Sequence, residues 1–449
     1  MRTLIVATTI AVLTGAVLAP GAGAAAPRSP GITSLAQVLQ TTRSAKSKSY
    51  VGRPGSRIAD AKAFAAMRAY VLRRYAGVHV EHSFIGAGKR VVDCVPITEQ
   101  PSVRGKGEIA KIGSPPLERP KQRFPQGAAI PFSEQQRLDV RLRPSHKDRF
   151  GNARYCRPGL MPLARITLTE LSRFPTLVSF FAKGDPREEF APGRTEPHPI
   201  PPDDASHYYA RGVQFVDNLG ADAWLNVWSP TVSDHQMSLS QLWVVGSTGE
   251  SKQTIEAGWQ VYPDKWGGSN AALFIYYTTK GYTSGSGCYN VDCSGFVQVA
   301  NNVYLGGGFD HYSATGATQW GFELQYKRDP RNGNWWLFYR GPGAWIPVGY
   351  YPHALFGAGQ LANNAEKVAY GGEDSGKPTA LQMGSGAFAA TGFANAAYQH
   401  TAFYIDTKVV SQWAALSAEV TDTSCYTADI GASSGPWGVF LFFGGPSCH

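Results

Sequence analysis

Residues 254–262 read Thr254-Ile255-Glu256-Ala257-Gly258-Trp259-Gln260-Val261-Tyr262 and decide the fold of the C-terminal half. Successive side chains of an extended strand point to opposite faces. The four apolar residues at odd positions therefore share one face, and Glu256 and Gln260 share the other. This pattern predicts a β-strand with one buried face. Glu256 then lies either on a solvated face, where acids usually lie, or on the floor of a cleft.

Similar short apolar segments recur through the C-terminal half, separated by glycine, asparagine and proline. The chain of 449 residues holds 50 glycines and 30 prolines, and 43% of it is hydrophobic against 17% charged, which excludes a disordered chain. The fold is predicted to be mainly β, an antiparallel, jelly-roll-like β-sandwich. The other expected strands are residues 224–228, 239–246, 272–279, 295–298, 321–327, 335–338, 346–351, 368–370 and 439–443.

The N-terminal half mixes helices and strands. Residues 57–75 carry apolar side chains at helical spacing, and residues 78–97 alternate around a glycine-containing turn. Residues 169–182 are expected to form a short helix. We therefore expect a smaller α+β domain before the sandwich.

The first residues have the pattern of a secretory signal peptide. Arg2 precedes a short apolar run over residues 4–18, and small residues follow up to Ala26. The run is too short to span a bilayer, so a membrane anchor is not expected. Residues 1–26 are interpreted as a signal peptide and the protein as secreted.

The chain has six cysteines, an even number that favours disulfides in an exported protein. Six cysteines allow fifteen pairings. Spacing favours a small loop between Cys288 and Cys293 and a C-terminal link between Cys425 and Cys448, which leaves Cys94 with Cys156. Cysteines and histidines show no metal-ligand spacing, and no metal or organic cofactor is expected.

Charge divides the chain into two parts. Residues 1–206 hold 31 lysines and arginines against 16 acids, whereas residues 207–449 hold 11 against 17. The N-terminal part is therefore basic and the C-terminal part acidic, so the two should attract each other. The basic charges are scattered without a nucleic-acid-binding motif, and no nucleic-acid partner is expected. Prolines crowd residues 190–206, which we interpret as an exposed linker.

A second carboxylate, Glu373, follows Gly371 and Gly372 near the end of an expected strand. Taken alone it fits a surface loop. Together, Glu256 and Glu373 suit acid–base chemistry, and zinc-protease, phosphate-loop and dinucleotide motifs are absent from the sequence.

Long blocks around these glutamates resemble the neprosin family, secreted glutamic peptidases that cleave after proline. The resemblance implies a β-sandwich whose catalytic glutamates are Glu256 and Glu373. Since such a pair must hold one proton, activity is expected to peak at acidic pH. The blocks are His207-Tyr208-Tyr209-Ala210, Asn226-Val227-Trp228-Ser229-Pro230, Ser238-Leu239-Ser240-Gln241-Leu242-Trp243-Val244, residues 254–261, Gly287-Cys288-Tyr289-Asn290, Cys293-Ser294-Gly295-Phe296-Val297-Gln298, Gly333-Asn334-Trp335-Trp336-Leu337, Val348-Gly349-Tyr350, Gly371-Gly372-Glu373 and Gln382-Met383-Gly384-Ser385-Gly386.

The N-terminal half is similar to the family's activation propeptide in two islands, residues 92–101 and 156–162. The resemblance implies an activation propeptide over residues 27–189, a linker or processing region over 190–206 and a catalytic domain over 207–449. The basic propeptide would then act as an intramolecular inhibitor, and the partners would be proline-containing peptides or proteins.

Two other side chains are candidates for supporting the transition state. Gln260 shares the strand face of Glu256, four residues further along, and Tyr277 is a weaker candidate. A rival function is a non-catalytic sandwich that binds glycans or a cell wall, with the two glutamates far apart or solvated. A glycosidase is a further alternative, since paired carboxylates also serve there.

Overall fold

The computed structural model describes residues 31–104, 109–121, 137–139, 147–183, 206–247, 251–377, 381–433, 435 and 437–448. The predicted signal peptide lies outside these residues, as does the predicted linker except for its last residue, Ser206. The domain boundary placed in that linker therefore stays a prediction.

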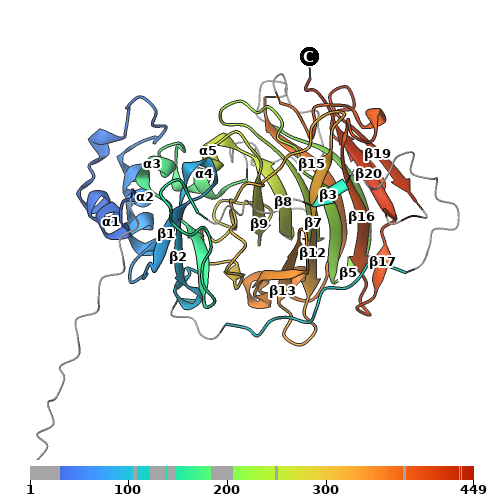
Figure 1. Cartoon of the computed structure of the whole chain (residues 1–449), viewed down its shortest axis with the longest axis horizontal. Coiled ribbons are helices and arrows are strands. Elements are labelled where there is room, and N and C mark those ends of the chain that lie inside the picture. The colour runs from blue at the N-terminus through green and yellow to red at the C-terminus, as the bar shows by residue number, and fades with distance from the viewer. Residues whose placement is uncertain are drawn as a thin grey trace, which may run out of the picture.

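Two stacked sheets form the C-terminal part, as predicted (Figure 1). The first sheet has seven antiparallel strands and carries the residues considered below. Its strands, in spatial order, are β10 (Gly287–Tyr289), β9 (Ala272–Thr278), β8 (Gln253–Val261), β7 (Met237–Gly246), β15 (Ala365–Gly376), β5 (Ser206–Asn218) and β18 (Ser417–Val420).

The second sheet has ten strands and packs its inner face against the first. Its strands are β11 (Val297–Gln298), β14 (Ile346–Tyr351), β13 (Trp335–Arg340), β12 (Gln319–Arg328), β6 (Gly220–Asn226), β16 (Ala397–Ile405), β20 (Val439–Gly444) and β19 (Thr427–Ala432), with β17 (Ser411–Trp413) on β16 and β3 (Arg137–Asp139) parallel to β12. The core between the sheets is closed by large side chains such as Trp259, whose indole N–H donates to the Asn226 carbonyl. That bond joins β8 of the first sheet to β6 of the second.

The N-terminal part is a small α+β unit beside the sandwich (Figure 1). Its sheet has the order β1-β2-β4. Ser34 and Asp60 cap the first two helices by accepting main-chain N–H groups. The elements are α1 (Leu35–Ser44), α2 (Ala61–Arg74), β1 (His82–Ile85), β2 (Val91–Pro96), β4 (Leu160–Ala164), α3 (Leu168–Leu171) and α4 (Leu177–Phe181); α5 (Pro263–Trp266) lies in the sandwich half.

The single helix predicted over residues 169–182 is wrong, because the structure has two short helices there. Pro175 lies between α3 and α4. A proline restricts the residue before it and supplies no N–H, so the first helix ends. Thr176 then caps α4 by accepting from the Ser179 N–H. This break directs the chain toward the first sheet.

All three disulfides predicted from spacing are confirmed: Cys94–Cys156, Cys288–Cys293 and Cys425–Cys448. The first staples β2 to the loop before β4, and the third ties the C-terminal segment to the sandwich. Within the described ranges, no helix combines the length and the apolar character needed to cross a bilayer.

The C-terminal disulfide closes a loop between cysteines 23 residues apart. Removing it frees the unfolded chain, so Cys425→Ser with Cys448→Ser should lower the free energy of unfolding by about 3 kcal/mol. Urea unfolding followed by tryptophan fluorescence measures this. An unchanged midpoint in the double variant, relative to wild type, would contradict the expected contribution of this link.

Candidate active site

Three neighbouring strands of the first sheet bring the two glutamates together. Glu256 on β8 lies opposite Trp243 of β7, and Glu373 on β15 lies opposite Leu239 of β7. Gln241 is the residue of β7 midway between these positions. Since facing residues on neighbouring strands share a face, all three polar side chains project from one face of the sheet.

Glycines make room for these side chains. Gly258 and Gly371 are the residues paired with Gln241 on the two flanking strands. A Cβ at Gly258 would lie 1.9 Å from the Ser240 carbonyl oxygen, so alanine does not fit there. Gly371 has φ of +138°, which favours glycine. Gln241 therefore has no side chain next to it at the paired positions of the two neighbouring strands.

A lysine from the N-terminal part fills the space between the glutamates. The Lys183 Nζ atom lies 2.5 Å from Glu256 Oε2 and 2.5 Å from Glu373 Oε2. All three side chains are at most 2% exposed. Gln241 Nε2 also donates to both oxygens, at 2.9 and 3.2 Å. The alternative of a solvated Glu256 does not describe this arrangement.

The other oxygen of each carboxylate has its own partners. Glu256 Oε1 accepts from the hydroxyls of Thr254 (2.7 Å) and Tyr282 (2.8 Å). Glu373 Oε1 lies 2.7 Å from His207 Nδ1. Both carboxylates are therefore held in one orientation by polar groups on every side.

The charges around Glu373 stabilise its ionised form. Burial raises its pKa, but the Lys183 ammonium and His207 outweigh burial and hold the pKa at about 2. Glu373 is thus ionised over nearly the whole pH range in this form of the protein.

The second sheet supports the site from below. The Tyr326 hydroxyl donates to the main-chain carbonyl of Glu256 at 3.0 Å. Gln399 Nε2 donates to the carbonyls of Gln241 (3.0 Å) and Gly371 (3.3 Å). These bonds fix the main chain of all three strands, so the carboxylates rest on a rigid floor.

The structure places the two predicted supporting residues away from this centre. The Gln260 amide donates to the Tyr289 hydroxyl (3.0 Å) and accepts from the Trp266 indole (3.2 Å). Tyr277 pairs with Ile255, which points into the core, and its hydroxyl lies 3.2 Å from Cys293 Sγ. Gln241 and Tyr282 are the side chains that donate to the carboxylates instead.

Five residues of this site were not predicted from the sequence: Lys183, Gln241, His207, Thr254 and Tyr282. Gln241 and His207 lie in blocks that resemble the neprosin family, and a buried glutamine inside an apolar strand is itself a signal. Lys183 has no such signal, because one lysine among 31 basic residues of a basic segment is not distinctive.

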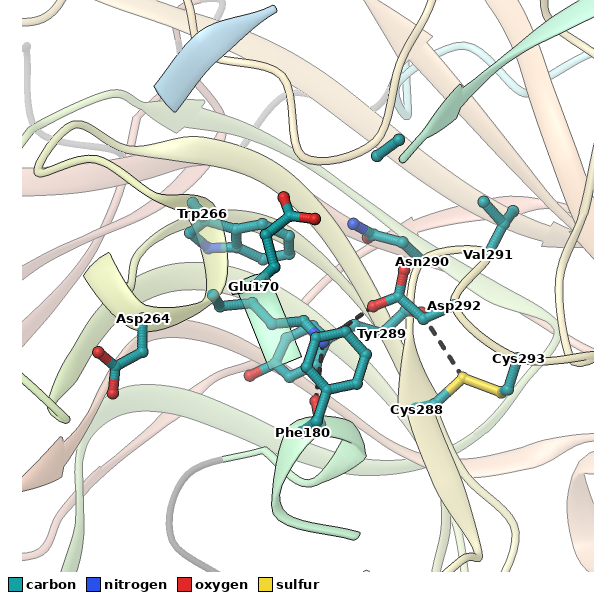
Figure 2. Close-up of polar contacts among 12 residues, drawn as sticks. Glu170, Phe180, Asp264, Trp266, Cys288, Tyr289, Asn290, Val291, Asp292 and Cys293 are labelled. Atoms are coloured by element: carbon teal, nitrogen blue, oxygen red, sulfur yellow. Dashed lines mark hydrogen bonds and ion pairs between the residues drawn. A yellow bond between two sulfur atoms is a disulfide. The ribbon is translucent and has the colours of Figure 1, made fainter. Parts of the chain in front are cut away.

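The N-terminal part also contacts the sandwich through a second lysine. Lys265 of α5 donates to the Phe180 carbonyl at 2.8 Å and pairs with Asp292 at 2.8 Å. Its Nζ lies 3.4 Å from the centre of the Phe180 ring, which Figure 2 shows next to Tyr289 and Asp292. Burial lowers the pKa of Lys265 to about 8, although Asp292 opposes this shift. Lys265 therefore stays mostly protonated at neutral pH.

A cavity of about 290 Å³ adjoins the glutamates. Thr254 and Tyr282, which bond Glu256, line it together with Trp243. Trp243 also lies next to Lys183, whose Nζ is 5.5 Å from the centre of its ring. The cavity is therefore separated from Glu256 by the side chains of Thr254 and Tyr282 that bond it.

Comparison with known proteins identifies a family domain. The family model described as Neprosin matches residues 234–446, the part of the chain that holds most of the blocks of the predicted resemblance. Scytalido-glutamic peptidase with a peptide-based transition-state analogue is 9% identical, with a TM-score of 0.31 over 54% of this chain and 98% of that chain. SCP-B, a member of the eqolisin family of peptidases in complex with the tripeptide Ala-Ile-His, is 9% identical with a TM-score of 0.30, over 54% of this chain and 98% of that chain.

The pKa of Glu373 sets the pH range in which the Lys183 contact is stable. The pKa lies below its ordinary value of 4.5, so the contact is fully present above about pH 4.5 and is lost as pH falls toward 2. We expect the free energy of unfolding to fall in this range, and to fall less in Lys183→Met. The exposed Lys408→Met is the matched control. Equal pH dependence in wild type and Lys183→Met would contradict this assignment.

Proposed function

Because the chain carries a Neprosin domain over residues 234–446, we propose that it is a secreted glutamic endopeptidase made in a latent form and selective for bonds after proline. The observation that carries the proposal is the pair Glu256 and Glu373, buried on one sheet face and bridged by Lys183 and Gln241. The predicted signal peptide and the three disulfides support secretion.

In the active form Lys183 has left and the two carboxylates share one proton. Two carboxylates so close cannot both ionise easily, so their pKa values separate. His207 remains beside Glu373 and favours its ionised form. Glu373 is therefore the base, and Glu256 carries the proton. A shared proton requires acidic pH, which accounts for the expected optimum.

The reaction follows from these roles. Glu373 accepts a proton from water as the water oxygen bonds to the scissile carbonyl carbon, which yields a tetrahedral oxyanion. In this structure the Gln241 amide N–H groups donate to both carboxylates. In the active form they can donate to that oxyanion. Glu256 then gives its proton to the leaving nitrogen as the carbon–nitrogen bond breaks.

Preference for proline rests on the family resemblance. The cavity beside the glutamates adds flat apolar surfaces, since Trp243 and Tyr282 line it. Such surfaces suit a rigid proline ring.

Latency is assigned to Lys183. Its ammonium occupies the position where the attacking water and the scissile carbonyl must lie, and it pairs with both acids. Further cationic contacts hold the N-terminal part in place. Arg57 pairs with Asp264 at 3.3 Å, and Arg74 donates to the carbonyls of Val291 and Asp292. The basic N-terminal part thus inhibits the peptidase in two ways, by pairing its cations with the acids and by covering the site.

Replacing either carboxylate tests the proposal. We expect acid-treated wild type to cut a proline-containing peptide after proline, and Glu256→Gln and Glu373→Gln to lose at least a thousandfold in kcat, because each removes the proton acceptor or donor. Mass spectrometry maps the products, and circular dichroism verifies folding. Cleavage that survives in both folded variants, or no cleavage by wild type freed of residues 27–189, would refute the proposal.

The choice between two glutamines gives a second test. Gln241→Ala should lower kcat by about 10²–10³-fold with little change in KM, because it removes the oxyanion donor. Gln260→Ala is the matched control and should affect stability more than kcat. A larger kcat loss in Gln260→Ala than in Gln241→Ala would return the donor role to Gln260.

A further inference from the structure

Residues 110–117 of the N-terminal part cross the outer face of the second sheet. Along β12, Leu324 and Tyr326 point into the core, whereas Gln325 and Lys327 point outward. The inward Tyr326 contacts the Glu256 carbonyl. The outer face bearing Gln325 is therefore on the opposite side of the sandwich from the two glutamates.

Gln325 holds one residue of this segment by its main chain. Its Oε1 accepts from the Leu117 N–H at 2.7 Å, and its Nε2 donates to the Leu117 carbonyl at 2.8 Å. Asp222 fixes the amide from the other side, at 2.9 Å from Nε2. A paired contact of this kind is how a neighbouring strand is recognised, independent of the side chain that it carries.

Four more side chains bind the main chain of the same segment. Lys327 Nζ donates to the Pro115 carbonyl at 2.5 Å, and Arg331 donates to the Ile112 carbonyl at 3.1 Å. The Tyr350 hydroxyl accepts from the Ala110 N–H at 2.9 Å, and Asp329 accepts from the Ser114 N–H. Six main-chain groups of eight residues are thus bound. We call these five side chains the main-chain track: Gln325, Lys327, Asp329, Arg331 and Tyr350.

The bound segment shows which peptide the track accepts. Ile112 is 60% exposed and Pro115 is also exposed, so the sandwich does not recognise their side chains. Gly113 lies against the Trp336 ring, where a Cβ would approach Cδ1 to 2.6 Å. Pro115 and Pro116 have no main-chain N–H that needs a partner. The bound N–H groups of the segment therefore belong to its non-proline residues.

We propose that the main-chain track is an exosite of the active enzyme, which binds a second, extended glycine- and proline-containing stretch of its protein substrate. This rests on the proposed function, since the track opens only when residues 27–189 leave. A six-residue peptide spans at most about 20 Å, too short to run around the sheet edge from one outer face to the other. The exosite therefore serves long substrates and not short ones.

Binding can be measured without catalysis. In the full chain, residues 110–117 are replaced by prolines, which offer the track no N–H group and no glycine beside Trp336, and a fluorescent synthetic peptide of residues 109–118 is added. We expect saturable binding by anisotropy, at least tenfold weaker in Gln325→Ala and unchanged in Gln412→Ala. The peptide with Gly113→Leu should also bind at least tenfold more weakly, because Trp336 blocks its side chain. Absent binding, or equal binding to Gln325→Ala, overturns the exosite.

Kinetics supply a second measurement if the replaced chain does not fold. Processed protein is compared on a proline-containing hexapeptide and on gelatin, a long glycine- and proline-rich chain. Gln325→Ala should raise KM at least fivefold for gelatin and leave hexapeptide kinetics unchanged; an equal effect on both substrates, or on neither, overturns the exosite. A hexapeptide left uncut by wild type would refute the peptidase itself, and the binding measurement would then still decide whether the track binds peptide.

Discussion

The contact of the Lys183 ammonium with Glu256 and Glu373 is the constraint on which this form of the protein depends. Two buried carboxylates so close repel each other, and leaving either charge unpaired is costly. On this sheet face the sandwich offers His207 to Glu373 alone, and the row between the glutamates holds Gln241 and two glycines rather than a charge that bridges both acids. The N-terminal part supplies it, so a segment that precedes the sandwich completes the electrostatics of its centre.

The sandwich contributes rigidity rather than charge. Strand register sets the separation of the carboxylates, and the glycines beside Gln241 keep the space between them open. Tyr326 and Gln399 of the second sheet then fix the main chain beneath. A site preorganised in this way accepts the Lys183 ammonium in this structure and, in the proposed active form, a water and a carbonyl in the same place. Under the proposed function, Lys183 and the substrate therefore compete for one position.

The N-terminal part reaches both outer faces of the sandwich. Lys183 blocks the first sheet, while residues 110–117 lie on the second, bound by Gln325 and Lys327. Removal of the N-terminal part would therefore expose the carboxylates and the main-chain track at the same time. The contacts differ in kind: charge holds Lys183, and that contact weakens in strong acid, whereas neutral main-chain bonds to Gln325 do not titrate.

The sequence by itself determined the sandwich class, the disulfides and the two glutamates, because alternation, cysteine spacing and family blocks are local patterns. Only the tertiary structure decided their partners. Gln260 was expected beside Glu256 because both lie on one face of a strand, yet four residues along a strand span about 13 Å, whereas the diagonal neighbour on the next strand lies about 7–8 Å away. Gln241 is therefore nearer. Lys183 lies 73 residues from Glu256 and 190 from Glu373, and no local pattern reports a contact between charges that only the completed fold brings together.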